Sequence, residues 1–416
     1  MDAVGIISEL NPFHNGHAHL IRTLREHGAE TVLCAMSGNF TQRGEAALCS
    51  KWARAEMAMQ GGADLVVELP FLYAVRNARD FARGGVQLLS ALGCRQLAFG
   101  CETTDHALLS ELTALLSEEP LPYKEELHRR LNAGQGFAAA RSAALCACMP
   151  EKANRIAQLL HQPNTILALE YLQAITRYAP HITPIPVERI GAGYHDPVLQ
   201  PFASATAIRQ RLYAQPILSP EIQQAVPAAT AAVLQREIHA GRCPFRLSVL
   251  DTMLLSTLRL KKAESLSPLL DMREGLENSL LKYADRCGTA EELVQAVSGK
   301  RYPKSRIRRL LLYALFAVTE GQVRSMEALP LPPYAHILAA NEHGMRYLRQ
   351  LAHTTPALPP LLFSGRELRR FLSTAPDAAV KQLQLDLQAS RLYTLGYPEP
   401  SRRIGDEDFR YCGIRR

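Results

Sequence analysis

Two histidines near the N-terminus have the types and spacing to do chemistry on a phosphate. His14 and His17 flank Gly16 in the sequence HNGH, shortly after an apolar run at residues 3–7. If a helix begins here, both imidazoles share its first turn, where free N–H groups and a partial positive charge suit a phosphate chain. Gly16 leaves room for backbone and phosphate to approach closely. Such donors would stabilise the charge that develops as an α-phosphate is attacked and pyrophosphate leaves.

The secondary structure expected around this segment decides whether it is a phosphate-binding site or only a polar helix start with two incidental histidines. A helical pattern over residues 15–27 ends at Gly28. Further strand candidates, separated mostly by amphipathic stretches, are residues 31–36, 64–69, 96–99 and 182–187. Apolar rather than alternating runs indicate a parallel sheet covered on both faces. The pattern predicts an α/β doubly wound domain, which binds ligands at the carboxyl ends of its strands.

The second half of the chain has a different pattern. Residues 214–227 are rich in Pro and Gln and are interpreted as a linker or domain edge. Beyond them the β pattern fades, and helical spacing is found at residues 247–260, 276–284, 290–297, 305–319 and 365–372. We therefore predict two parts: a catalytic α/β domain at residues 1–213 and a mainly α-helical region at residues 214–416.

Composition excludes several classes of protein. The 416 residues are 47% hydrophobic and 21% charged, which argues against disorder. No apolar run approaches the ~20 residues of a membrane span, and no secretory signal is visible, so we expect a cytoplasmic protein with no membrane association. Nine scattered cysteines without CxxC spacing are expected to be mostly buried thiols. The net charge of +7 permits a polyanionic partner without requiring one.

A series of motifs gives a more specific indication. In chain order they are ELNPFHNGH at 9–17, MSGNFTQRGE at 36–45, SKW at 50–52, GADLVVELP at 62–70, FGCE at 99–102, QPNTIL at 162–167, RIGAGYHD at 189–196, KRY at 300–302 and SRI at 305–307. The series resembles the tRNA(Met) cytidine acetate ligase family of the HxGH nucleotidyltransferase superfamily. The resemblance implies a Rossmann-like nucleotidyltransferase fold for the N-terminal domain.

The resemblance also implies a set of ATP-binding positions. They are Ile7, Ser8, Glu9, Leu10, Asn11, Pro12, Phe13, His14, Asn15, Gly16, His17, Ala18, His19, Leu20, Gly100, Asn164 and Arg189. Gly100 follows a strand and would expose bare backbone to adenine or ribose. Asn164 could instead cap a helix, and Arg189 could instead form a surface salt bridge.

Further basic and hydroxyl residues are candidates for the phosphates. Residues 204–209 (SATAIR) resemble a second phosphate-binding signature, in which Arg209 would neutralise pyrophosphate, although an ordinary capped helix is the alternative. Arg43, Lys51 and Arg54 could add positive charge over the site or simply be solvated. We expect His14, His17, Lys51 and Arg209 to be the catalytic residues.

The reaction that the resemblance implies has two steps. Acetate and ATP give acetyl-adenylate, and the acetyl group then passes to the wobble cytidine of elongator tRNA(Met), forming N4-acetylcytidine. Mg²⁺ is expected with ATP, although no dedicated metal cluster is visible, and no protein partner is inferred. Residues 300–309 hold six basic and no acidic residues and are a candidate tRNA contact, or else a solvated helix face.

Two other functions remain open from the sequence. A small-molecule adenylyltransferase acting on a phosphorylated cofactor precursor would use the same fold, but such enzymes are usually much shorter. A non-catalytic RNA-binding relative would be expected to have lost His14, Gly16 and His17, which are all present.

Overall fold

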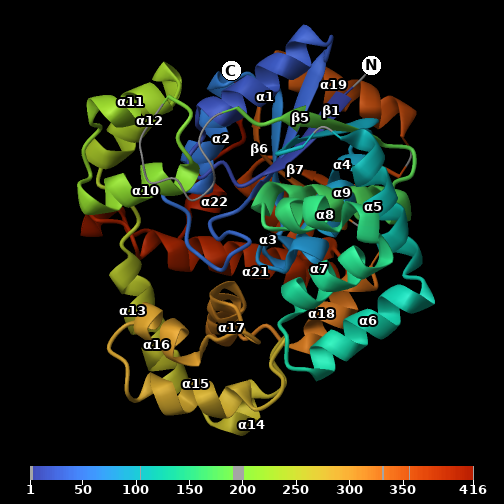
Figure 1. Ribbon diagram of the computed structural model, residues 1–416. Helices are drawn as coiled ribbons and strands as arrows, with labels where there is room; N and C mark the ends of the chain where they lie inside the picture. The colour runs from blue at the N-terminus through green and yellow to red at the C-terminus, as the bar shows by residue number, and fades with distance from the viewer. Residues whose placement is uncertain (1–2, 104, 191–200, 330–331, 356, 416) are drawn as a thin grey trace.

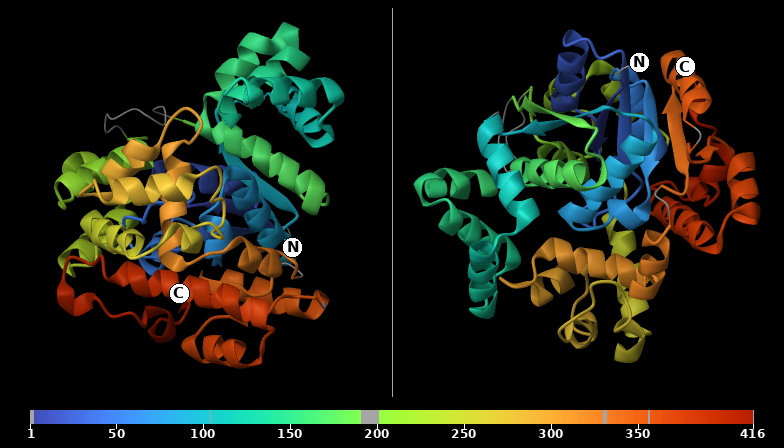
Figure 2. Two further views of the ribbon diagram at one scale, coloured as in Figure 1. Left: turned by 90° about the horizontal axis from the view of Figure 1, so that it is seen from below. Right: turned by 90° about the vertical axis from the view of Figure 1, so that its right-hand side faces the viewer.

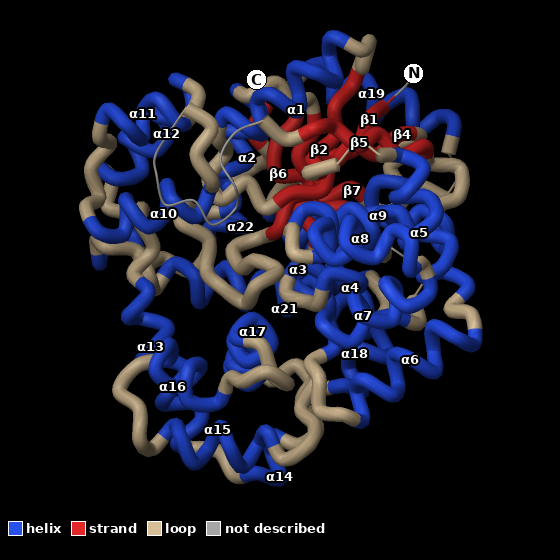
Figure 3. The backbone as a smooth tube through the Cα atoms, viewed as in Figure 1, coloured by secondary structure: helices blue, strands red, loops and turns tan. Residues whose placement is uncertain are grey.

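A mainly parallel β-sheet lies in the upper part of the molecule as drawn, with helices on both faces (Figures 1 and 3). The computed structural model describes residues 3–103, 105–190, 201–329, 332–355 and 357–415. The strands are β1 (Ala3–Ser8), β2 (Thr31–Ser37), β3 (Leu65–Leu69), β4 (Gln96–Cys101), β5 (Thr183–Glu188), β6 (Ala335–Ala340), β7 (Leu361–Leu362) and β8 (Ile414–Arg415). All five strands expected in the first half are therefore present.

The strand order creates a switch point beside β1. The sheet runs β5-β4-β1-β2-β3-β6-β7, and β8 pairs with β6. From β1 the chain proceeds through β2 to β3 on one side, then crosses to place β4 on the other side of β1, with every one of these pairs parallel. In open α/β sheets a crevice forms where the strand order reverses, at the carboxyl ends of the strands. The doubly wound fold predicted from the sequence is confirmed, and it places this crevice next to Ser8.

Helices cover the two faces of the sheet because successive side chains of each strand point to opposite sides. Ile7 packs in one core with Leu89 of α4, and Ile6 packs in another with Ile21 of α1. The helices between β1 and β4 are α1 (Asn15–Glu26), α2 (Lys51–Gln60), α3 (Phe71–Ala74) and α4 (Ala78–Ala91).

A helical arm is inserted between β4 and β5. It consists of α5 (His106–Glu118), α6 (Leu121–Asn132), α7 (Phe137–Cys148), a 3₁₀ turn (Pro150–Lys152), α8 (Ala153–Leu160) and α9 (Pro163–Tyr178). Helix α9 packs along α4, whereas α6 and α7 project from the body on the side opposite the C-terminal helices (Figure 2). The return of α9 to the sheet brings its N-terminus back to the edge where β4 ends.

The second half is mainly helical, as expected. Its helices are α10 (Ala205–Ala214), α11 (Pro220–Ala225), α12 (Ala228–His239), α13 (Leu247–Arg259), α14 (Ala263–Leu266), α15 (Leu276–Ala284), α16 (Ala290–Val297), α17 (Lys304–Phe316), α18 (Glu320–Glu327), α19 (Glu342–Thr354), α20 (Gly365–Thr374), α21 (Asp377–Thr394) and α22 (Glu407–Arg410), with a 3₁₀ turn at Pro400–Arg402. Helices α13 to α16 form a lobe apart from the sheet, at the bottom of Figure 1. The segment 214–227 is not a plain linker, because α11 lies in it and buries Ile222 and Ala225 in the core.

The expectation that β structure fades after residue 214 is wrong at the sheet edge. Strand β6 pairs antiparallel with β3, so a strand from the second half extends the sheet of the first. Every residue of β6 is buried, and the strand continues into α19 through Asn341, whose side chain donates to Asp64 Oδ1 at 2.9 Å. The C-terminal residues therefore complete the α/β core. The sheet contains strands from both sides of residue 213, where the sequence predicted the boundary between the catalytic and the helical part.

Two further sequence expectations concern membranes and cysteines. Within the ranges given above, no helix combines the length and the hydropathy needed to cross a membrane. All nine cysteines are free thiols, and most are buried. Residues 191–196 of the RIGAGYHD motif lie outside the described residues.

Candidate active site

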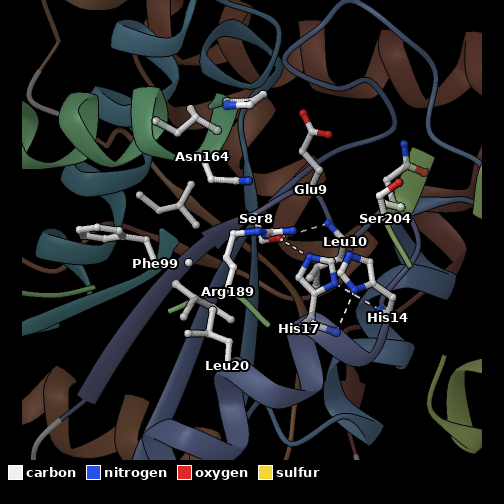
Figure 4. A pocket seen from close by; sticks show the side chains of 18 of the residues that line it. Ser8, Glu9, Leu10, His14, His17, Leu20, Phe99, Asn164, Arg189 and Ser204 are labelled. Carbon is white, nitrogen blue, oxygen red and sulfur yellow. Dashed lines mark hydrogen bonds between the residues drawn. The ribbon is translucent and has the colours of Figure 1, made fainter. Parts of the chain in front are cut away.

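A cavity of about 340 Å³ lies at the switch point of the sheet. Its floor is formed by the ends of β1 and β4, including Ser8 and Gly100, and Arg189 borders it directly after β5 (Figure 4). Residues from the first turns of four helices line it: α1, α4, α9 and α10. Because each helix N-terminus carries free N–H groups and a partial positive charge, their convergence suits a chain of phosphates.

His14 and His17 form a pair at the start of α1. His14 is the N-cap, and its Nδ1 accepts from the Gly16 N–H at 3.0 Å. The His17 Nδ1 accepts in turn from the His14 N–H at 3.2 Å, so the two residues form a reciprocal capping box. The ring centroids lie 4.0 Å apart, and both rings line the cavity (Figure 4). The arrangement expected from the three-residue spacing is therefore present.

The hydrogen bonds assign the tautomer of both imidazoles. Since each Nδ1 accepts from a backbone N–H, each neutral ring must carry its proton on Nε2. The His17 Nε2 lies 3.3 Å from the Ser8 hydroxyl. Burial, reinforced by the charges of Arg189 and Arg209, lowers the pKa of His14 to about 3, and burial also holds the pKa of His17 well below its usual value. Both residues are neutral hydrogen-bond donors at neutral pH.

This neutral pair predicts a pH dependence of stability. An unfolded His14 protonates as the pH falls below 6.5, whereas the folded form stays neutral until about pH 3. Acid therefore favours the unfolded chain, and between pH 7 and pH 5 His14 should remove about 2 kcal/mol of stability. Urea unfolding of the wild type and of His14→Asn at both pH values measures this, because the variant should lose less stability. Equal losses in the two proteins would contradict the assignment of a neutral His14.

The other residues of the segment 7–20 divide into those facing the cavity and those supporting it. Facing it are Ile7, Ser8, Glu9, Leu10, Asn11, His14, Gly16, His17, His19 and Leu20. Four residues do not line the cavity: Pro12, Phe13, Asn15 and Ala18. Asn15 instead donates to the carbonyls of Pro201 and Gln224, both at 2.7 Å, and so ties α1 to the chain around α10 and α11. A side chain at Gly16 would place its Cβ 2.8 Å from the His14 ring, so glycine keeps the histidine in place.

Glu102 and Arg189 define the surroundings of Asn164 and Gly100. Glu102 accepts from the Asn164 side-chain amide at 2.5 Å and from the Thr165 N–H at 2.8 Å, at the start of α9. Asn164 is therefore not the N-cap of the helix, and its amide is oriented by a carboxylate. At Gly100 an added Cβ would lie 3.2 Å from the Arg189 side chain, so the absence of a side chain lets Arg189 lie against β4.

Arg209 connects α10 to the histidine segment. It donates to the Asn11 carbonyl at 2.9 Å and to the Thr206 hydroxyl at 3.3 Å. The Ser204 hydroxyl caps α10 by accepting from the Ala207 N–H at 3.2 Å, so the capped-helix interpretation holds while the residue still lines the cavity. Glu9 also lines the cavity; it accepts from the Gln42 N–H at 2.9 Å, and burial raises its pKa.

Lys51 does not lie at the cavity. Its side chain is fully buried, with Nζ 2.7 Å from Glu68 and 2.8 Å from Asp408. Because both carboxylates already hold the ammonium away from solvent and substrate, the geometry gives no support to a catalytic role. Arg54 is buried as well and donates to the backbone carbonyls of Glu9 and Ser37, at 2.6 and 3.1 Å. It fixes the loops around the site instead of offering charge over it.

Most basic side chains at residues 300–309 form ion pairs or hydrogen bonds within the chain. Arg308 donates to Glu45 and to Glu291, both at 2.8 Å, and Arg309 is buried with a 3.3 Å bond to the Gln42 carbonyl. At Gly44 an added Cβ would lie 2.7 Å from the backbone nitrogen of Arg309, so the loop at residues 41–45 packs directly on α17. The expected tRNA contact is thus reduced to the exposed residues of the run. Arg308 and Arg309, at the end of the run, join α17 to the loop at residues 41–45, which we call the active-site loop.

The apolar lining of the cavity was missed in the sequence. Phe99 from β4 and the α9 residues Ile166, Leu167 and Tyr171 all border it. The Phe99 and Tyr171 rings lie 5.6 Å apart. A signal was available, since Pro163, Leu167 and Tyr171 recur every fourth residue and so share one face of α9. Among the described residues, no group of three His, Cys, Asp or Glu side chains is arranged to hold a metal ion.

Fold and site together define a nucleotidyltransferase. Residues 1–408 match the model of the HIGH Nucleotidyl Transferase family, and the chain belongs to this family. Within it, the chain is 39% identical to the tRNA(Met) cytidine acetate ligase of Syntrophomonas wolfei, and 35% identical to that of Halothermothrix orenii, each over 98% of both proteins. The chain is thereby a member of the tRNA(Met) cytidine acetate ligase family, as its motifs indicated.

Two solved structures agree with this placement. The apo crystal structure of Thermotoga maritima TmcAL aligns with a TM-score of 0.93 at 32% identity, over 100% of this chain and 99% of that one. The same protein bound with alpha-thio ATP aligns with a TM-score of 0.91 over the same shares.

Proposed function

We propose that this chain is an ATP-dependent ligase that activates acetate as acetyl-adenylate and transfers the acetyl group to the wobble cytidine of elongator tRNA(Met). The product on the tRNA would be N4-acetylcytidine. The observation that carries the proposal is the intact His14–Gly16–His17 helix start at the switch-point cavity, in a chain similar over 98% of its length to ligases of this name. A tRNA substrate would place the activity in the cytoplasm.

The nucleoside of ATP would occupy the part of the cavity that is apolar. Phe99, Ile166 and Leu167 offer a surface for adenine, and Gly100 leaves backbone exposed beside it. The amide of Asn164, oriented by Glu102, would hydrogen-bond the base or ribose. Arg189 lies against Gly100 and is close enough to lower the pKa of His14 through its charge, so its guanidinium would meet the phosphates.

The first chemical step needs stabilisation of charge and no general base. Acetate is already anionic at neutral pH and can attack the α-phosphorus directly. The Nε2–H of neutral His14, together with the N-termini of α1 and α10, would stabilise the oxygens of the α-phosphate. Arg209 would neutralise the departing pyrophosphate, because it is held at the cavity by Asn11 and Thr206.

Mg²⁺ would enter with the ATP phosphates, which supply its hard oxygen ligands. It would neutralise part of the phosphate charge. The described residues offer no carboxylate cluster to hold it independently, so its place would be set by the nucleotide and the residues that bind it.

The tRNA would bind across the helical part of the chain, residues 214–416. Lys300, four residues before α17, is exposed, as are Arg301 and Lys304, which lie beside Glu274 and Glu291. These three members of the basic run would contact the phosphates. The wobble cytidine must leave its stack to reach a buried acetyl group, which is feasible in a single-stranded loop.

Acetate-dependent ATP–pyrophosphate exchange in the absence of tRNA tests this proposal. We expect labelled pyrophosphate to enter ATP only when acetate is present. Absence of exchange with acetate, combined with turnover of a phosphorylated nucleotide-like substrate, would contradict the ligase and favour the small-molecule adenylyltransferase.

A further inference from the structure

A second cavity of about 360 Å³ adjoins the nucleotide cavity. The two share Arg43, Thr206 and Arg209, so the second opens beside the residues that would hold the phosphates. Its walls come from the loop at residues 43–46 and from helices α10, α13, α16 and α17. It therefore lies at the junction between the catalytic part and the helical lobe that would meet the tRNA.

The lining of this cavity suits a flat ring with a polar edge. Leucine and valine side chains make its apolar surface: Leu247, Leu250, Leu254, Val294, Leu311 and Leu312. Tyr213 adds an aromatic ring, and Leu247 borders the cavity at the first turn of α13, where it is 47% exposed. A volume of this size is typical of small-ligand sites.

The lining carries as many guanidinium groups, those of Arg43, Arg209 and Arg308, as carboxylates, so its charge does not select a polyphosphate, and its carboxylates offer acceptors for an amine. Three carboxylates line the cavity, those of Glu45, Asp251 and Glu291. Glu45 is the one nearest the shared residues, with Oε2 3.9 Å from Arg209 and Oε1 2.8 Å from Arg308. Its loop is fixed against α17, because the Glu45 carbonyl accepts from the Thr41 N–H at 2.9 Å and Gly44 lies against the α17 backbone. The carboxylate already accepts from Arg308, and its remaining lone pairs can accept from a further N–H donor.

We propose that this second cavity receives the unstacked cytosine of the tRNA, with its exocyclic amine against Glu45 and its ring among the leucines. The inference rests on the proposed function and adds the acceptor side of the same site. The N4 nitrogen attacks the acetyl carbonyl carbon, the C–N bond forms, and the bond from that carbon to the phosphate oxygen breaks, so AMP leaves with the electron pair. The nitrogen becomes cationic on attack, and Glu45 takes one of its protons and returns it to solvent.

Filling the cavity tests the proposal without changing the nucleotide site. Ala290 borders the cavity at the first position of α16 and is half-buried. Ala290→Phe should lower kcat/KM for acetyl transfer to tRNA by about 100-fold while acetate-dependent ATP–pyrophosphate exchange stays at the wild-type level. Ala263→Phe is the matched control, since Ala263 is also half-buried at the first position of a helix, α14, and borders neither cavity. The control should transfer normally.

Two further variants keep the test decisive if Ala290→Phe folds poorly. Leu247→Trp adds bulk at an exposed rim position and should also impair transfer selectively. Glu45→Gln should lower kcat for transfer by about 100-fold with little change in KM for tRNA, because the acceptor of the proton is lost. Normal transfer in Ala290→Phe and Leu247→Trp, or equal loss of exchange and transfer, would overturn the inference. Absence of exchange in the wild type would instead refute the proposed function.

Discussion

Replacing His14 with alanine is expected to lower acetate-dependent ATP–pyrophosphate exchange by about 100- to 1,000-fold, the usual effect of removing a donor that stabilises transition-state charge. The reason is the fixed tautomer. Backbone N–H groups occupy both Nδ1 atoms, so the His14 Nε2–H is available to the α-phosphate. Because the residue is also the N-cap of α1, alanine should cost about 1 kcal/mol of stability as well.

Comparison of two variants separates the chemical role of His14 from capping. Asparagine is a good N-cap but cannot place a donor where Nε2 lies, so His14→Asn should recover stability and not exchange. His27→Ala, at the exposed C-terminal end of the same helix, is the control and should exchange normally. Recovery of exchange in His14→Asn would show that the imidazole serves only to cap the helix.

Replacing Lys51 with alanine is expected to destabilise the fold by about 3–5 kcal/mol, because it leaves two buried carboxylates without their cation. Glu68 and Asp408 are only 4% and 3% exposed, and Lys51 holds the pKa of Glu68 down to about 2 together with His336. The ion pairs also join α22 to α2 and β3, so their loss should loosen the C-terminal segment from the sheet.

Urea unfolding and exchange kinetics together decide the role of Lys51. Lys124→Ala is the control, since the Lys124–Glu119 pair is exposed at 4.0 Å and should contribute less than about 1 kcal/mol. A Lys51→Ala protein of wild-type stability that had lost exchange would restore Lys51 to the catalytic residues.

The sequence was sufficient to predict those elements and contacts whose signal lies within a few neighbouring residues. Short apolar runs predicted β1 to β5, and the spacing of His14 and His17 predicted a shared face at a helix start. Both follow from the periodicity of strands and helices, which requires no knowledge of distant partners. The HNGH segment therefore predicted a phosphate-binding helix start, and its His14, Gly16 and His17 line the switch-point cavity.

The sequence was insufficient to predict structure and contacts that depend on residues far apart in the chain. β6 consists of five apolar residues and His336, and only its pairing with β3, some 270 positions earlier, makes it a strand of the central sheet. Lys51 looked like a free cation beside the site because Asp408, its second partner, is distant in the chain. The same holds for Arg308, whose pairing with Glu45 turns an expected RNA contact into a support for the active-site loop.

The most direct test of the account is the transfer of labelled acetate to tRNA. Purified protein would be incubated with ATP, ¹³C-acetate and elongator tRNA(Met), and the tRNA would be digested and analysed by mass spectrometry. We predict labelled N4-acetylcytidine at the wobble position, formed together with AMP, and none when that cytidine is replaced by uridine. Unmodified cytidine at the wobble position, under conditions where acetate-dependent exchange is rapid, would contradict the account.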